Sequence, residues 1–269
     1  MNIEEHKQKA KDIRKDILDE VYYAQSGHPG GSLSIADIMA VLYFNELKID
    51  ENNPRWEDRD RLILSKGHCS PALYAALAER GFFNKESLKD FRKLESNLQG
   101  HPDLNKVPGV DMTSGSLGQG LSVANGNAIS GKMDKKDYRV YCILGDGEIE
   151  EGQIWEAAMT SNKYKLDNLC VIVDNNNLQI DGTIEEVMSP YPIDKKFESF
   201  GFNVINIDGN NIEEILNAFE QAKSIKGKPT CIVAKTIKGK GISFMENKAE
   251  WHGKAPNEEQ YQSAIEELK

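Results

Sequence analysis

Two polar clusters in the second half of the chain have the residue types of a metal and phosphate site. The segment GDG at 145–147 follows one apolar run, and DNNN at 174–177 follows the next. Asp146 and Asn176 offer a carboxylate and an amide oxygen, which Mg²⁺ combines with water and phosphate oxygens. The glycines beside Asp146 allow a diphosphate to approach the backbone closely. Each cluster alone is also typical of a simple turn, so the hypothesis depends on their spacing.

Four of the five histidines form a second group of chemically able residues. His28, His68, His101 and His252 each stand next to a glycine in a segment that resembles a loop. Histidine is the side chain best suited to exchange protons near neutral pH. A single loop histidine is more often a hydrogen-bonding or solvent-facing residue, but four in such settings favour a shared site. His6 lies among charged residues of the first helix and is expected to face solvent.

Two further segments could contact an anion. The glycine-rich segment GSLGQG at 115–120 leads into a helix, whose N-terminus is a natural anion site. It lacks the GK[ST] ending of a P-loop, which argues against a nucleoside triphosphate. The segment KTIKGKG at 235–241 is basic in an acidic chain, yet solvated lysines are the simpler interpretation. Lys235, Lys238 and Lys240 are therefore given no role.

The elements that would position these residues follow an alternating pattern. Apolar runs at 139–144, 168–173, 203–207 and 230–234 alternate with helical segments near 151–163 and 212–223. This alternation predicts an α/β fold, a parallel sheet with helices on both faces. If the strands before Asp146 and Asn176 are neighbours, a right-handed crossover brings both residues to the carboxyl edge of the sheet. Open α/β sheets bind their ligands at that edge.

The N-terminal half is predicted to be mainly helical. An amphipathic helix over residues 3–24 ends at SGHPGG, residues 26–31, which is too rich in Gly and Pro for the interior of an element. Further helices are predicted at 34–46 and, with Ser70 as N-cap and Pro71 at the first helical position, up to Gly81. Residues 97–120 read as a long loop and 257–269 as a last helix. We expect residues 1–269 to form a single domain.

Composition narrows the class of protein. The 269 residues include 33 Lys and Arg against 43 Asp and Glu, and a net charge of −10 argues against a nucleic-acid partner. No apolar run is long enough for a transmembrane helix, and the charged N-terminus lacks the apolar region of a secretory signal. Four scattered cysteines without a CxxC pair favour reduced thiols and offer no zinc site. We expect a cytoplasmic protein with no membrane partner.

The order of these motifs resembles that of transketolases. LGDG at 144–147 followed by DNN at 174–176 is similar to the thiamine diphosphate motif. Five other segments resemble the family in its order: SGHPG at 26–30, RDRLILSKGH at 59–68, GHP at 100–102, TSGSLGQG at 113–120 and IDG at 180–182. The resemblance implies a thiamine-diphosphate-binding fold. It also implies transfer of a two-carbon ketol unit from a ketose phosphate to an aldose phosphate, a reaction of the pentose phosphate pathway.

The resemblance also assigns a cofactor site, with thiamine diphosphate and Mg²⁺ as cofactors. Asp146, Asn176 and the backbone carbonyl of Leu178 would be the Mg²⁺ ligands, and the amide of Gly147 would contact the diphosphate. Among the remaining matched residues, Gly115 and Leu117 would lie against the aminopyrimidine and thiazolium rings, and His68 would also contact the diphosphate.

The remaining roles concern substrate and assembly. By resemblance, His28 and His252 would handle protons at the C3 hydroxyl of the donor, and His101 would contact its C1 hydroxyl. Glu151 resembles a family glutamate at the contact between two cofactor sites, and Glu156 is a second candidate for that contact. The alternative for both glutamates is a solvated first helical turn, where acids complement the helix dipole.

The resemblance covers only the first of three transketolase domains. The chain is similar to the N-terminal subunit of a split transketolase, whose partner chain of about 300 residues would supply the pyrimidine-binding and C-terminal domains. We expect a hetero-oligomer with two copies of each chain, acting on sugar phosphates that these residues do not specify. The glutamate that promotes carbanion formation would lie in the partner. Two alternatives stay open: another thiamine diphosphate enzyme, such as one similar to 1-deoxyxylulose-5-phosphate synthase, or a non-catalytic cofactor-binding module.

Overall fold

A five-stranded parallel sheet forms the centre of the molecule. The computed structural model describes residues 1–180 and 182–269, so Asp181 of the IDG motif lies outside the described residues. The strands run in the order β1-β2-β3-β5-β4. Their bounds are β1 (Arg61–Leu64), β2 (Val140–Gly145), β3 (Leu169–Asn175), β4 (Asn203–Asp208) and β5 (Thr230–Lys235). The predicted α/β fold is confirmed, although the short strand β1 was not predicted.

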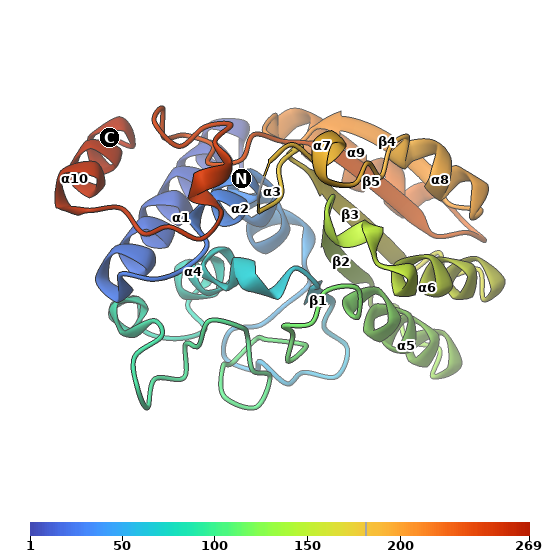
Figure 1. The fold of residues 1–269 in the computed structure, drawn as a ribbon. Helices are drawn as coiled ribbons and strands as arrows, with labels where there is room; N and C mark the ends of the chain where they lie inside the picture. Colours follow the sequence, from blue (N-terminus) through green and yellow to red (C-terminus); the bar gives the residue numbers. More distant parts are fainter. Residues whose placement is uncertain (181) are drawn as a thin grey trace.

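Helices cover both faces of this sheet, as the apolar runs predicted. Successive side chains of each strand alternate between two hydrophobic clusters, with Cys142 on one face and Tyr141 on the other. The face of Cys142 packs against three helices: α5 (Gly120–Met133), α6 (Gly152–Lys163) and α8 (Ile193–Ser199). The opposite face packs against α1 (Ile3–Ala24), α3 (Ala36–Val41), α4 (Ser70–Arg80) and α9 (Ile212–Ser224). Figure 1 shows α5 and α6 on one side of the sheet and α1 and α4 on the other.

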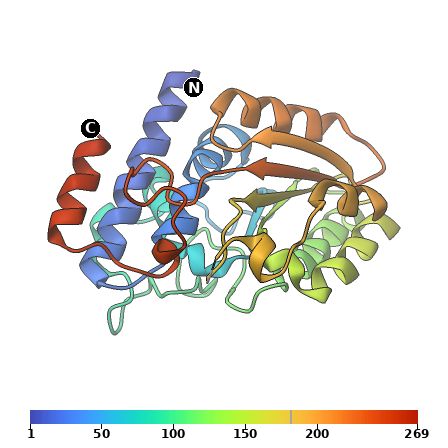
Figure 2. The ribbon, with the colours of Figure 1, turned by 45° about the horizontal axis from the view of Figure 1, so that its top comes forward.

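The first helix is buried more widely than its sequence pattern indicates. The predicted helix over residues 3–24 is confirmed as α1, but the expectation that His6 faces solvent is wrong. His6 is fully buried, and its Nδ1 lies 2.8 Å from the carbonyl oxygen of Asn2. The reason is that α1 contacts α3, α4 and α9 and also the last helix, α10 (Glu258–Glu267). Figure 2 shows α1 and α10 side by side, with both ends of the chain on the same side of the molecule.

The segment SGHPGG is not the simple helix breaker that the sequence predicted. Residues Pro29–Ser34 form the short helix α2, which begins with proline at a position where the missing N–H is tolerated. Its glycines pack very closely: a Cβ at Gly30 would lie 2.8 Å from the carbonyl oxygen of Trp251. The helix predicted at 34–46 is also divided. It comprises α3 and a π-helical turn, η1 (Leu42–Glu46).

The remaining predicted elements are confirmed within a few residues. Helices α6, α9 and α10 lie where the pattern placed them, and α4 ends at Arg80, directly before Gly81, whose φ is 95°. Cys69, rather than Ser70, occupies the N-cap position of α4. No helix or strand falls within residues 97–119, all of them described. None of the helices in the described ranges is long and apolar enough to cross a membrane. The short elements are η2 (Gly67–Cys69), η3 (Lys85–Asp90), η4 (Glu148–Glu150), α7 (Ile184–Val187) and η5 (Ala249–His252).

Candidate functional site

A cavity of about 330 Å³ lies at the carboxyl edge of the sheet, where β1, β2, β3 and β5 end. We call it the histidine cavity, because four histidines line it. Ten of the predicted site residues contribute to its wall: His28, His68, His101, Gly115, Leu117, Asp146, Gly147, Asn176, Leu178 and His252. The fold therefore brings together residues that are far apart along the chain.

Three of the histidines form a compact triangle. The ring centroids of His28, His68 and His252 are 5.2 to 5.4 Å apart in all three pairs. Burial lowers the pKa of His28 and of His68 to about 4 and that of His252 to about 3. The positive charges of Lys66 and Lys238 act in the same direction on His68 and His252. All three rings are therefore neutral at pH 7, and each carries a proton on one nitrogen and a lone pair on the other.

The fourth histidine lies beside the glycine-rich loop. A Cβ at Gly115 would lie 3.6 Å from the ring of His101. His101 is exposed, although burial of part of the ring still lowers its pKa below the usual value. His101 therefore lines the cavity and also contacts solvent.

Lys238 is a cavity residue to which the sequence gave no role. Its side chain is buried, its Nζ donates to the carbonyl oxygen of Leu178 at 3.0 Å, and the same Nζ lies 3.0 Å from Nδ1 of His252. An ammonium group only donates, so His252 accepts through Nδ1 and carries its proton on Nε2. Burial lowers the pKa of Lys238 to about 8. Lys235 is exposed and Lys240 pairs with Glu246 at 3.4 Å, so the solvated interpretation holds for those two.

The predicted Mg²⁺ ligands offer three kinds of oxygen. Asp146 is 3% exposed, and its two carboxylate oxygens accept from the backbone N–H of Gly147 at 2.9 Å and of Asn177 at 2.6 Å. The Oδ1 of Asn176 accepts from the N–H of Leu178 at 3.2 Å. Between Asn176 and Leu178, Asn177 adopts a left-handed φ of 64°, which turns the chain at this point.

This donor set fits a hard divalent cation. Burial and the nearby charge of Asp174 raise the pKa of Asp146 to about 7. A carboxylate, an amide oxygen and a backbone carbonyl are the ligands that Mg²⁺ prefers, with water and phosphate completing its shell. The set holds a single acid, and the described residues contain no group of three or more His, Cys, Asp or Glu able to bind a metal.

A buried ion pair at the wall of this cavity was not predicted. Lys66 Nζ is 2.5 Å from Asp174 Oδ2, and both side chains are almost completely buried. Burial acts to raise the pKa of Asp174, but the charge of Lys66 and the hydrogen bonds around it keep that pKa below its usual value. In the sequence, Lys66 stands two residues before His68, and Asp174 directly precedes the asparagine run, but nothing in the sequence indicates that Lys66 and Asp174 meet.

Glu148 is a second unpredicted residue of the cavity wall. Its Oε2 accepts from the N–H of Gly145 at 3.0 Å, and its Oε1 accepts from the N–H of Gly118 at 2.9 Å and from the hydroxyl of Ser65. The Ser65 hydroxyl also accepts from the N–H of Gly120 at 3.0 Å. One buried carboxylate thus joins the glycine-rich loop to the ends of β1 and β2. In the sequence, the position of Glu148 directly after the GDG motif was the feature that could have indicated its role.

The two glutamates predicted at a contact between cofactor sites lie outside the cavity. Glu151 occupies the N-cap position of α6 and is exposed, and Glu156 is exposed on the same helix. Their predicted role concerns an assembly of several chains and stays a prediction.

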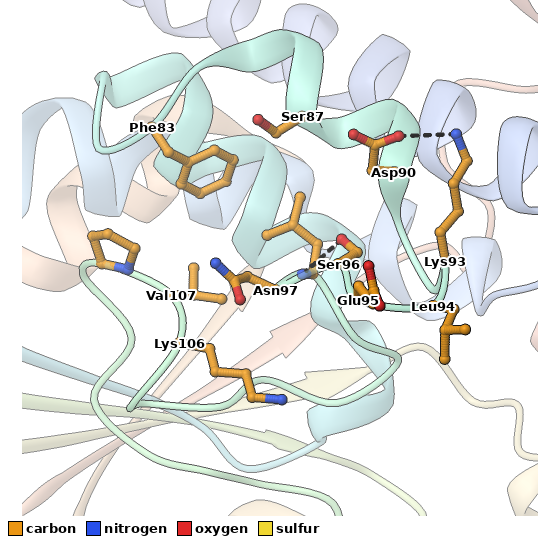
Figure 3. Close-up of a pocket in the computed structure, with 12 residues that line it drawn as sticks. Phe83, Ser87, Asp90, Lys93, Leu94, Glu95, Ser96, Asn97, Lys106 and Val107 are labelled. Carbon is orange, nitrogen blue, oxygen red and sulfur yellow. Dashed lines mark hydrogen bonds and ion pairs between the residues drawn. The ribbon is translucent and has the colours of Figure 1, made fainter.

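A second cavity of about 370 Å³ holds none of the predicted residues. It is lined by residues of η3 and of the loops near 93–98 and 106–108, and Figure 3 shows its side chains. Two of its polar contacts are made between near neighbours. Lys93 pairs with Asp90 at 2.9 Å, and the hydroxyl of Ser96 accepts from the N–H of Leu98 at 3.1 Å. We call it the η3 cavity.

Comparison with known proteins identifies the class to which this fold and site belong. Residues 5–268 match the family model described as "Transketolase, thiamine diphosphate binding domain". The chain belongs to the transketolase family. Its fold also matches a crystal structure of transketolase from Campylobacter jejuni, with a TM-score of 0.94 and 38% identity, over 100% of this chain and 43% of that one.

Similar curated proteins fall into two groups by length. The chain is 48% identical over 256 residues to the 6-deoxy-6-sulfo-D-fructose transketolase subunit SqwG of Clostridium sp. (strain MSTE9), covering 95% of this chain and 93% of the relative. It is 42% identical to one subunit of the apulose-4-phosphate transketolase of Phocaeicola vulgatus, covering 100% of this chain and 95% of that subunit. Human transketolase is 44% identical over 97% of this chain, which spans only 42% of that protein.

Proposed function

We propose that the chain is the thiamine diphosphate-binding subunit of a two-chain transketolase. The complex would transfer a two-carbon ketol unit from a ketose phosphate to an aldose phosphate in the cytoplasm. The observation that carries this proposal is the histidine cavity, because it gathers the oxygen donors, the glycine-rich loop and four histidines at one edge of the sheet. Relatives named as transketolase subunits have nearly the same length, which supports the two-chain arrangement.

The cavity residues divide into those that would hold the cofactor and those that would act on substrate. Asp146, Asn176 and the Leu178 carbonyl would bind Mg²⁺, and Gly147 would offer its amide to the diphosphate. Lys238 adds a buried positive charge beside these oxygens, which favours a diphosphate in the same place.

The ring-binding end of the cavity would be formed by the glycine-rich loop. Gly115 and Leu117 line the wall and would contact the aminopyrimidine and thiazolium rings. When bound, the cofactor supplies the carbanion and electron sink that cleavage beside a ketose carbonyl requires. The protein contributes a largely buried setting in which its polar groups keep fixed positions.

Proton transfer is the part of the chemistry that this chain's side chains would perform. His28 and His252 would handle protons at the C3 hydroxyl of the donor, because both rings are neutral at pH 7 and lie at two corners of the triangle. The Lys238 contact keeps Nε2 of His252 protonated, ready to donate a hydrogen bond. His101, at the exposed end, would contact the C1 hydroxyl, and His68 the diphosphate.

A partner chain of about 300 residues would complete the active site. It would supply the pyrimidine-binding domain with its glutamate and most contacts to the substrate phosphate, in a complex with two copies of each chain. Glu151 and Glu156 would lie at the contact between the two cofactor sites. We expect the chain alone to have negligible transferase activity, even with Mg²⁺ and thiamine diphosphate.

The decisive experiment isolates the chain from its native cells under mild conditions and identifies what accompanies it. A stoichiometric second chain allows the pair to be assayed with hydroxypyruvate and with pyruvate as ketol or acyl donor. Transfer from hydroxypyruvate supports a transketolase, and preference for pyruvate supports an enzyme similar to 1-deoxyxylulose-5-phosphate synthase. Robust turnover by the purified single chain would contradict the two-chain proposal.

A further inference from the structure

Asp174 accepts hydrogen bonds from four different side chains beneath the histidine cavity. Its carboxylate accepts from the hydroxyl of Ser34 at 2.7 Å, from Nζ of Lys66 at 2.5 Å and from Nδ2 of Asn176 at 2.8 Å. The hydroxyl of Thr236 donates to its other oxygen. Asp174 itself is completely buried, so this hydrogen-bonding capacity is used within the protein.

Each donor belongs to a different segment that carries a residue of the cavity. Ser34 is the last residue of α2, which begins directly after His28, and Lys66 stands two residues before His68. Thr236 stands two residues before Lys238 in the same way. One carboxylate therefore joins four segments that the sequence separates widely.

Lys66 extends this connection to the histidine triangle. Besides its contact with Asp174, its Nζ donates to the carbonyl oxygen of Gly31 at 2.8 Å. Gly31 lies in the first turn of α2, close to His28. The ion pair thus holds α2 against the segment that follows β1.

The contact with Asn176 also determines which way its amide points. Nδ2 donates to Asp174, so Oδ1 lies on the other side of the amide, where it accepts from the N–H of Leu178 and has a second lone pair for another partner. An amide without such a partner can rotate and exchange its oxygen and nitrogen. The Asp174 carboxylate accordingly makes Asn176 present an oxygen, and not an N–H group, to a cation.

Stability alone gives little reason for such an arrangement. Replacing a buried ion pair with uncharged side chains of similar volume is often neutral or stabilising, because removing charges from water is expensive. We infer that Asp174, with Lys66, is a positioning residue that fixes the Asn176 amide and the cavity segments in the one arrangement that binds thiamine diphosphate with Mg²⁺. This inference rests on the proposed function.

The test replaces both charges together in the complex of this chain with its partner. Lys66→Met with Asp174→Asn keeps the side-chain volumes similar and leaves no unpaired buried charge. We expect the affinity for thiamine diphosphate, measured by calorimetric titration in the presence of Mg²⁺, to fall by about 10- to 100-fold, as for residues that orient metal ligands. The melting temperature without ligand should change little.

A matched pair elsewhere in the chain provides the control. Arg14 and Asp37 form a buried ion pair at 2.5 Å between α1 and α3. Arg14→Met with Asp37→Asn makes the same kind of change outside the cavity and should leave cofactor affinity unchanged. An equal loss of affinity in both double variants would mean a general effect of removing buried charge and would overturn the inference.

A single variant keeps the test decisive if the double variant does not fold. Asn176→Asp retains the ion pair and offers Mg²⁺ a carboxylate in place of an amide. It should nevertheless bind the cofactor more weakly, since a second carboxylate cannot donate to Asp174. Affinity equal to that of the wild type, in this variant or in Lys66→Met with Asp174→Asn, would overturn the inference. A wild-type complex that binds no thiamine diphosphate would instead refute the proposed function itself.

Discussion

The histidine cavity and the η3 cavity have similar volumes but opposite physical character. The first encloses about 330 Å³ and the second about 370 Å³. Lys238, in the first, is 2% exposed, whereas the side chains of Lys93 and Asp90, in the second, are 54% and 56% exposed. Volume therefore does not distinguish a site, but the burial of its polar groups does.

The cost of burying charge explains why this difference is informative. In the η3 cavity, Lys93 and Asp90 are neighbours along the chain, and such exposed pairs contribute about 1 kcal/mol or less. In the histidine cavity, Asp146, Lys66 and Lys238 are withdrawn from water, which destabilises a protein unless partners or a ligand compensate. Buried groups with shifted pKa values gathered in a cavity are therefore strong candidates for function.

Removal of the Asp146 carboxylate should have the largest effect. Asp146→Ala takes away the charged member of the oxygen donor set, so Mg²⁺-dependent binding of thiamine diphosphate by the two-chain complex should weaken by at least about 100-fold. The fold should persist, because the carboxylate forms no ion pair with any of the described residues that its loss would break. Calorimetric titration and circular dichroism measure these two results. Unchanged cofactor affinity would refute the ligand assignment.

Loss of two histidines should separate chemistry from cofactor binding. His28→Ala combined with His252→Ala removes the groups proposed to move the donor proton, and kcat should fall by about 100-fold or more. The affinity for thiamine diphosphate should stay close to that of the wild type, because neither ring is assigned to the cofactor. Activity that survives in this double variant would favour the non-catalytic cofactor-binding module.

The histidine triangle should also make stability depend on pH. The pKa values of His28 and His252 fall from 6.5 to about 4 and about 3 in the folded chain. Between these values and 6.5 the unfolded chain binds protons that the folded chain does not, so stability is complete above pH 6.5 and decreases as the pH falls toward 4. Urea midpoints of the ligand-free chain at pH 7 and pH 5 measure this. The double histidine variant should lose less stability over that interval; an equal loss would contradict the assignment.

Substitution in the η3 cavity should have the smallest effect. Lys93→Ala removes an exposed ion pair and should change the free energy of unfolding by less than about 0.5 kcal/mol. Cofactor affinity and kcat of the complex should match those of the wild type. A clear loss of either would place function in the η3 cavity and remove the distinction between the two cavities.

Local pattern was sufficient to predict most of the elements. Apolar runs predicted β2 to β5 because those strands are rich in apolar residues, and β1 was missed because its four residues follow a charged segment. His6 was misplaced for a related reason: the amphipathic pattern of α1 does not reveal how many other helices pack around it.

The candidate site was predictable where a residue stands within a recognisable motif. Asp146 and Asn176 stand at strand ends in distinctive clusters, and the four cavity histidines stand beside glycines. The sequence offered less indication that Glu148 and Lys238 belong to the site. Most of their partners are backbone groups and side chains far away in the sequence, which no local pattern specifies.

Residue order alone was enough to establish the alternation of strands and helices, and with it the edge of the sheet at which Asp146 and Asn176 would meet. These follow from local periodicity and from the handedness of crossover connections. Which side chains share protons and charge at that edge depends instead on the folded arrangement. The Lys66–Asp174 ion pair joins segments from distant parts of the chain, and Lys238 meets His252 across a turn of the C-terminal region. The pKa values of these groups depend on burial, which exists only once both faces of the sheet are covered.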